Sequence, residues 1–220
     1  MTGFRPPLPQ QLTIAGPAGG LEALLEEPTG APFARFAVIC HPHPQHGGTM
    51  HNKVVHTLAR VLQEQGVATV RFNYRGVGAS GGSYDAGAGE TADALAVVAW
   101  GRARWPLAAL VLAGFSFGAM VSLQASATAR PAALISVAPA VTRLEITQLA
   151  RPHCPWLIVQ GDSDEIVDSH AVQAWSQRFS PPPTLRLLPG VDHFFHGRLH
   201  ELKSALADTS WQRSPSPLEG

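Results

Sequence analysis

The stretch Leu107-Ala-Ala-Leu-Val-Leu-Ala113 runs directly into Gly114-Phe-Ser-Phe-Gly118, and Ala119-Met-Val-Ser-Leu-Gln-Ala125 follows it. The first segment is a short apolar run typical of a buried strand, and the third has the apolar spacing of a helix. The G-x-S-x-G pentapeptide therefore lies where a strand turns sharply into a helix. Such a turn strains the backbone of Ser116, and side chains in place of the two glycines would collide with neighbouring chain.

This turn gives Ser116 the surroundings of a nucleophile. We expect its hydroxyl to stand clear of the sheet, with the N-terminus of the following helix aimed at it. The free N–H groups and the dipole of that helix favour a developing negative charge. A chance match is the alternative, because the chain contains 21 glycines. The strand before the pentapeptide and the helix after it favour the catalytic interpretation.

Composition limits the class of protein. The 220 residues are 45% hydrophobic and 15% charged, which is typical of a compact domain with one core. Basic and acidic residues number 16 each, so no polyanionic partner such as nucleic acid is expected. No apolar run is long enough to span a membrane, and no signal peptide is visible. We expect a single domain over 1–220, with irregular tails at 1–10 and 210–220.

The two cysteines, Cys40 and Cys154, both lie inside apolar runs. This setting favours reduced, packed thiols in a cytoplasmic protein over a disulfide or a catalytic cysteine.

Strands and helices alternate along most of the chain, after an opening hairpin formed by 12–15 and 21–26. This alternation predicts an α/β fold: a doubly wound, mostly parallel sheet of eight strands with the antiparallel hairpin at one edge. In such sheets the chemistry gathers beyond the carboxyl ends of the strands. The further strands are expected at 35–40, 67–74, 107–113, 133–138, 156–160 and 184–188, and the helices at 53–65, 90–104, after 118, 169–179 and from the loop after 193 to about 208.

Two further stretches, 41–50 (HPHPQHGGTM) and 71–81 (RFNYRGVGASG), carry a family resemblance together with the pentapeptide. The order of Ser116, an acid after the next-but-one strand and a histidine after the last strand resembles the α/β-hydrolase superfamily over nearly the whole chain. More narrowly, the chain resembles small bacterial serine hydrolases that are distantly similar to dienelactone hydrolases and carboxylesterases. Most dienelactone hydrolases carry a cysteine at the position of Ser116, so their substrate does not carry over.

The resemblance selects an acid from three aspartates. The pattern G-x-x-D-x-x-V is matched by Gly161, Asp164 and Val167, which points to Asp164. Asp162 suits a turn, because aspartate readily bonds its own backbone, and Asp168 suits a helix cap.

A histidine follows the last strand within 191–195 (VDHFF), which resembles the family's histidine loop, so His193 is the expected base. His196, near the start of the final helix, and His200, within that helix, are expected to serve as cap or surface residues. The resemblance implies that His193 takes the proton of Ser116, while Asp164 holds the imidazole tautomer.

The resemblance also implies an oxyanion hole made of the backbone N–H groups of Phe117 and His43. His41-Pro42 stands where many relatives have His-Gly, and the prolines stiffen this loop. Phe115, Phe117 and His41 are candidates to line the substrate pocket; packing beneath the turn is the alternative for the two phenylalanines.

Two other motifs point to cofactors. His41-x-His43-x-Gln45-His46 is one residue away from a zinc-binding H-x-H-x-D-H loop, but glutamine replaces the aspartate and the element order is not that of the zinc enzymes. The segment 76–81 matches G-x-G-x-x-G, but no helix opens after it. We therefore expect no metal and no cofactor.

The crossover at 140–153 is too short for a cap domain, so a shallow, lidless site is expected. Without a lid to bury a long acyl chain, small, soluble esters with short or medium acyl groups fit better. The resemblance implies a serine hydrolase of carboxylic esters that acts through an acyl-enzyme. A thioesterase or peptidase with the same triad, a non-catalytic scaffold of this fold and a metallohydrolase at the histidine loop are the alternatives. The sequence assigns no oligomeric state.

Overall fold

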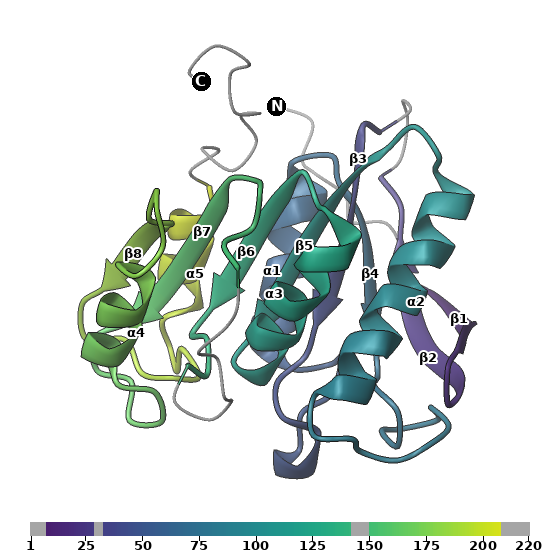
Figure 1. Ribbon diagram of the computed structural model, residues 1–220, viewed down its shortest axis with the longest axis horizontal. Helices are drawn as coiled ribbons and strands as arrows, with labels where there is room; N and C mark the ends of the chain where they lie inside the picture. The colour runs from purple at the N-terminus through teal and green to yellow at the C-terminus, as the bar shows by residue number, and fades with distance from the viewer. Residues whose placement is uncertain (1–7, 29–32, 142–149, 208–220) are drawn as a thin grey trace.

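The computed structural model describes residues 8–28, 33–141 and 150–207. These residues build one eight-stranded sheet with helices on both faces (Figure 1). The predicted C-terminal tail and most of the predicted N-terminal tail and crossover lie outside the described ranges, at 208–220, 1–7 and 142–149, whereas Gln10, expected in the irregular tail, begins the first strand. The strands, in chain order, are β1 (Gln10–Gly16), β2 (Gly19–Glu26), β3 (Arg35–Cys40), β4 (Ala68–Phe72), β5 (Ala109–Phe115), β6 (Ala133–Val137), β7 (Trp156–Gly161) and β8 (Thr184–Leu188).

The strand order is β1-β2-β4-β3-β5-β6-β7-β8. β2 pairs antiparallel with β1 and with β4, whereas every pairing from β4 through β3 to β8 is parallel. The predicted fold class is therefore confirmed. Strands β3 and β5–β7 are covered on both sides, which is why they appear in the sequence as unbroken apolar runs.

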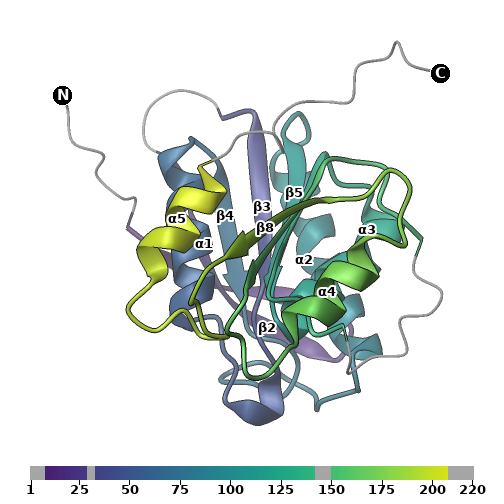
Figure 2. The same cartoon turned by 90° about the vertical axis from the view of Figure 1, so that its left-hand side faces the viewer.

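Two hydrophobic cores, and not the one core expected from the composition, lie on the two faces of this sheet. Figure 2 shows the helices that cover each face. One core joins the sheet to α1 and α5, and the other joins it to α2, α3 and α4. No helix in the described ranges has the length and apolarity needed to cross a membrane. The helices are α1 (Lys53–Glu64), α2 (Ala88–Arg104), α3 (Phe117–Ala129), α4 (Ser169–Ser176) and α5 (Leu199–Leu206), with a short 3₁₀ turn at Pro44–His46.

The last helix begins later than the sequence predicts. Instead of following the loop at 193 directly, α5 starts at Leu199. Phe195 and Gly197 have φ angles of 55° and 67°, a left-handed conformation that cannot continue a right-handed helix. The chain between His193 and Leu199 therefore forms turns, and these turns hold the histidine at the sheet edge.

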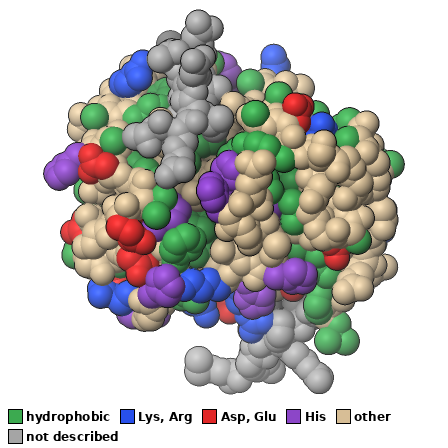
Figure 3. Space-filling model, turned by 90° about the horizontal axis from the view of Figure 1, so that it is seen from below, with side chains coloured by type: hydrophobic (Ala, Val, Ile, Leu, Met, Phe, Trp, Pro, Cys, Tyr) green, Lys and Arg blue, Asp and Glu red, His purple; other side chains and the backbone are tan. Residues whose placement is uncertain are grey.

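The four loops that carry the candidate site residues all leave the sheet at the carboxyl ends of its strands, because β3, β5, β7 and β8 run parallel. The loops are 41–52, the turn at Ser116, 162–168 and 189–198. Figure 3 looks onto the lower side of the molecule, where histidine side chains gather among hydrophobic ones. The topology thus brings residues from distant parts of the sequence to one place.

Candidate active site

Ser116 lies in a strained turn between β5 and α3, with φ 55° and ψ −117°. The two neighbouring glycines make this turn possible. A Cβ atom added at Gly114 would lie 2.1 Å from the carbonyl oxygen of Gly118. A Cβ atom at Gly118 would lie 2.3 Å from the carbonyl oxygen of Cys40. The steric reason predicted for both glycines is confirmed, because the obstacles are backbone atoms that cannot rotate away.

Replacing Gly118 by alanine is expected to destabilise the fold by about 1–3 kcal/mol, because the new methyl group overpacks the junction of β3 and α3. Helix propensity alone would give the opposite sign, since alanine is favoured over glycine by about 1 kcal/mol inside a helix. Urea unfolding of the two proteins checks the sign. A variant more stable than the wild type would show that the loop after β3 moves aside without cost.

The structure brings together the three side chains that the sequence nominates. His193 Nε2 lies 3.1 Å from Ser116 Oγ, and His193 Nδ1 lies 2.7 Å from Asp164 Oδ2. The serine and the histidine are largely buried, with exposed fractions of 9% and 2%. The three groups therefore form a continuous hydrogen-bonded line.

The carboxylate of Asp164 is held on both oxygens. Oδ1 accepts hydrogen bonds from the backbone N–H groups of Ile166 (2.9 Å) and Val167 (2.7 Å), and Oδ2 faces His193. Burial raises the pKa of Asp164, but the hydrogen bonds from His193, Val167 and Ile166 outweigh burial and leave this pKa below its ordinary value. The carboxylate is therefore ionised at neutral pH and can balance a positive charge on the imidazole.

The loop after β3 is oriented by a buried histidine. Tyr74 N donates to His41 Nε2 (3.2 Å), so the proton of the ring is on Nδ1, which donates to the carbonyl oxygen of Pro42 (2.7 Å). Burial lowers the pKa of His41 to about 3, so the ring stays neutral. The carbonyl of Pro42 and the N–H of His43 belong to one peptide and point in opposite directions. Fixing the carbonyl on the buried side turns the N–H away from it, an arrangement compatible with the predicted donor role of His43.

Phe117 is the second predicted donor. It is the first residue of α3, so its backbone N–H has no carbonyl one turn earlier in the helix to receive it. Its neighbour Ser116 occupies the N-cap position without a side-chain capping bond. The helix N-terminus therefore keeps a free donor beside the serine, in a position that favours negative charge.

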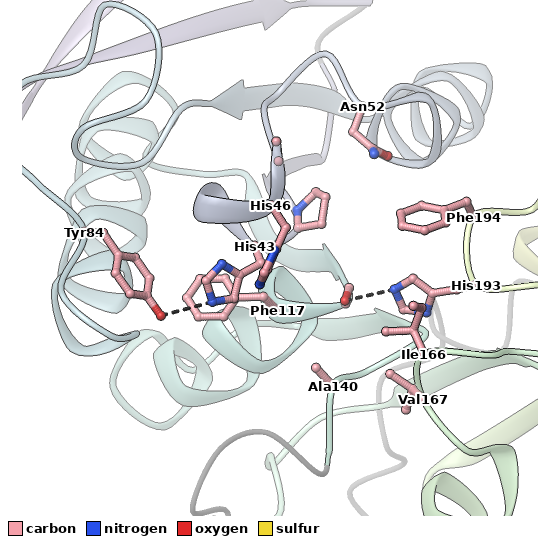
Figure 4. A pocket seen from close by; sticks show the side chains of 14 residues that line it. His43, His46, Asn52, Tyr84, Phe117, Ala140, Ile166, Val167, His193 and Phe194 are labelled. Atoms are coloured by element: carbon pink, nitrogen blue, oxygen red, sulfur yellow. Dashed lines mark hydrogen bonds between the residues drawn. The ribbon is translucent and has the colours of Figure 1, made fainter.

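A cavity of about 610 Å³ opens over these groups. Figure 4 shows His43, Tyr84 and Phe117 on one side of it and His193 and Phe194 on the other. The Tyr84 hydroxyl lies 3.1 Å from His43 Nε2, and the rings of His43 and Phe117 are 4.9 Å apart. The remaining lining comes from Pro42, His46, Gly47, Gly48, Asn52, Ser116, Ala140, Ile166 and Val167.

Comparisons with known proteins show the family of this chain. A family model described as "Serine aminopeptidase, S33" matches residues 43–152. A serine hydrolase "without lid" from Xanthomonas campestris is 44% identical, with a TM-score of 0.89, over 98% of this chain and 99% of that chain. An α/β serine hydrolase homologue from Coxiella burnetii is 45% identical, with a TM-score of 0.89, over 94% and 100% of the two chains. An uncharacterized protein from Rickettsia prowazekii is 34% identical over 90% of this chain and 87% of its own length. The chain belongs to the α/β-hydrolase superfamily.

The residues that the sequence left as alternatives have other positions in this hydrolase. Asp162 Oδ1 accepts a hydrogen bond from Gly190 N (2.7 Å), and Asp168 caps α4 by accepting from His170 N (3.0 Å). His196 pairs with Asp192 at the surface, and the side chain of His200 is 72% exposed. None of these four side chains reaches Ser116.

Two predicted pocket residues need correction. Phe115 and His41 are fully buried and do not line the cavity of the hydrolase. Phe115 packs its ring 5.1 Å from that of His193, and His41 is engaged on both nitrogens beneath the loop. Tyr84 and Phe194, which were not predicted from the sequence, line the cavity as well. The signals that could have found them are an aromatic residue in a Gly/Ser-rich loop and one next to the candidate histidine.

The two cofactor motifs take structural roles in the hydrolase. His41 has both ring nitrogens engaged, and His43 accepts from Gln45 N at Nδ1 (3.3 Å) while Nε2 faces Tyr84. These contacts occupy both ring nitrogens of His41 and of His43. In the 76–81 loop, Ser80 Oγ donates to the carbonyl oxygen of Asn73 and accepts from Glu22 N, so this loop is tied to β2. Within the described ranges, no cluster of three or more His, Cys, Asp or Glu residues could hold a metal ion.

Proposed function

We propose that this chain is a serine hydrolase that cleaves carboxylic esters through Ser116, His193 and Asp164, by way of a covalent acyl-enzyme. The observation that carries this proposal is the hydrogen-bonded line from Ser116 Oγ through the imidazole to the carboxylate, at the wall of an open cavity. A scaffold protein of this fold would have no need to bury and align all three groups.

The geometry supports an ordered proton path. As Ser116 Oγ attacks the ester carbon, His193 Nε2 takes its proton, and the carboxylate of Asp164 stabilises the imidazolium. The carbonyl oxygen becomes an oxyanion and accepts hydrogen bonds from the N–H groups of Phe117 and His43. The tetrahedral intermediate then collapses, the C–O bond to the alcohol breaks, and His193 returns the proton to the leaving oxygen. A water molecule, activated by the same imidazole, releases the acid and restores the serine.

An active-site fluorophosphonate probe tests the proposal directly. Labelling is expected at Ser116 in the wild type and is expected to vanish in Ser116→Ala. Activity is expected to be unchanged by a chelator. Loss of activity on chelation, or labelling of another residue, would refute the serine mechanism and favour the metallohydrolase alternative.

The open cavity favours soluble esters with short or medium acyl groups. Without a lid, methylenes beyond the apolar wall formed by Phe117, Ile166 and Phe194 would gain no buried surface. We expect kcat/KM for p-nitrophenyl butyrate to exceed that for the palmitate by about tenfold or more. Initial rates below the micelle concentration of each ester check the order, and the reverse order would show that a long acyl chain is covered.

An amide substrate is the second candidate, because the matched family model is described as a serine aminopeptidase. An aminopeptidase must also bind the α-ammonium group of its substrate, a role suited to a carboxylate. The described lining of the cavity contains neither aspartate nor glutamate. We therefore favour the ester, and a panel of matched esters, thioesters and aminoacyl anilides discriminates between the three classes.

Neither cysteine competes with Ser116. Both are free and buried, and burial raises the pKa of Cys40 to about 12 and that of Cys154 to about 11. Both thiols therefore stay protonated and unreactive at neutral pH. Buried free thiols are also the state expected in a reducing compartment, which supports our proposal of a cytoplasmic location.

A further inference from the structure

The last position of β7 before Gly161 holds a polar side chain where an apolar one is expected. Trp156, Leu157, Ile158 and Val159 are buried apolar residues, and Gln160 follows with an exposed fraction of 0%. Its amide nitrogen lies 2.9 Å from Asp164 Oδ2, on the same oxygen that faces His193 Nδ1. Gln160 does not line the cavity and so does not touch the substrate.

The orientation of the Gln160 amide is set by its surroundings. Nε2 donates toward three oxygens: Asp164 Oδ2, the carbonyl of Val167 (3.2 Å) and the carbonyl of Gly161 (3.1 Å). With the amide turned over, Oε1 would face these same three acceptors. The observed orientation leaves Oε1 buried without a hydrogen-bond partner among the described residues. A buried unpaired carbonyl is costly, so the fold retains this amide for what its N–H groups do.

With Gln160 included, the Asp164 carboxylate accepts four hydrogen bonds, two on each oxygen. The backbone of Ile166 and Val167 holds Oδ1, and His193 and Gln160 share Oδ2. We propose that Gln160 is a positioning residue of the triad, which fixes the Asp164 carboxylate against His193 and limits its basicity. The donated hydrogen bond draws charge from Oδ2, so the proton stays on His193 Nδ1. This inference rests on the proposed function.

Replacing Gln160 by methionine keeps the size of the side chain, removes the donor and removes the unpaired carbonyl. We expect kcat to fall by about ten- to a hundredfold with little change in KM, since the base is displaced while the cavity is intact. The acid limb of kcat/KM should move to higher pH, because a carboxylate that keeps its full charge stabilises the protonated imidazole more strongly. The other charged groups near this pair are Glu165, whose Oε2 lies 3.4 Å from His193 N, and Asp192, which pairs with His196; both are unchanged in the variant.

Gln160→Glu gives a second, independent signature. When protonated, the introduced carboxyl group can donate to Asp164 Oδ2 in place of the amide. When ionised, it repels the carboxylate of Asp164 and releases it from its position. The rate of this variant is therefore expected to fall as the pH rises, over a range in which the wild-type rate is constant. A merely structural glutamine would not produce an alkaline limb.

Gln63→Met is the matched control. Gln63, in α1, is also buried, with an exposed fraction of 3%. Its amide donates to Oγ1 of Thr69 in β4 (2.9 Å), and neither residue lines the cavity. This variant is expected to keep the wild-type kcat and pH profile, whatever its melting temperature.

The rate at which a fluorophosphonate labels Ser116, measured from pH 5 to 10, reports the reactivity of this serine and requires no known substrate. If the wild type is not labelled, the proposed function itself fails. If the wild type is labelled and Gln160→Met reacts at the same rate with the same acid limb, only the role of Gln160 is overturned. Equal losses in Gln160→Met and Gln63→Met, each matched by a lower melting temperature, would likewise overturn it in favour of a packing effect.

Discussion

Ser116→Ala is expected to lower kcat for ester hydrolysis by on the order of 10³-fold or more, because the variant lacks the oxygen that becomes acylated. The oxyanion donors and the cavity remain, so KM should change little. The melting temperature is expected to stay close to that of the wild type, since the hydroxyl makes its contact with the edge of the imidazole and not with the core. Steady-state rates measured on one ester check kcat and KM, and thermal unfolding checks the melting temperature.

Ser122→Ala is the control for this substitution. Ser122 is fully buried in α3, and its hydroxyl donates to the carbonyl oxygen of Ala119 (2.9 Å). Removing this hydroxyl should leave kcat within about twofold of the wild type. Retention of a tenth of the activity by Ser116→Ala would mean that another group carries the chemistry.

Asp164→Asn is expected to lower kcat by about 10⁴-fold, because it forces the wrong tautomer on His193. Oδ1 is held by two backbone N–H groups, so the amide oxygen must take this position and the amide nitrogen must take that of Oδ2. The new N–H groups then face Gln160 Nε2 and His193 Nδ1, which are donors in the wild type. His193 must present a bare Nδ1 and carry its proton on Nε2, where it can no longer accept the proton of Ser116.

Asp162→Asn tests whether this effect is specific. The Asp162 carboxylate accepts from Gly190 N and from Ser163 Oγ, and it does not contact His193. The asparagine oxygen can take over the bond from Gly190, so activity is expected within about twofold of the wild type. Comparable losses in the two variants would indicate that the 162–168 loop, and not the tautomer, had changed.

Much of the fold could be predicted from the sequence, because each strand has a local pattern of apolar residues. The strands β3 and β8 were predicted with their observed bounds, and β5 (Ala109–Phe115) lies two residues further along the chain than the predicted strand at 107–113. The order of Ser116, Asp164 and His193 along the chain, together with parallel strands, was enough to place all three at one sheet edge. Their catalytic roles stay predictions until they are tested.

The rest of the site depends on the conformation of the loops, which cannot be predicted from the spacing of residues in the sequence. Tyr84 belongs to a Gly/Ser-rich loop 41 residues from His43, and only the tertiary path brings the two together. His41 looked like a pocket residue because it stands in a polar loop, yet its ring points beneath the loop and bonds Tyr74 N. From the sequence, Gln160 is only the last residue of a predicted strand. No local pattern indicates that its amide contacts Asp164 in the loop that follows.

The place of β8 and His193 late in the sequence has a consequence for biosynthesis. Ser116 and His193 are 77 residues apart, and the histidine follows the last strand to be made. A ribosome-bound chain that stops before β8 can present the strained serine but lacks His193, the base that we propose. The nascent protein is therefore expected to be inert toward cellular esters until its final strand has emerged and joined β7, so hydrolytic power arises only once the whole sheet has been assembled.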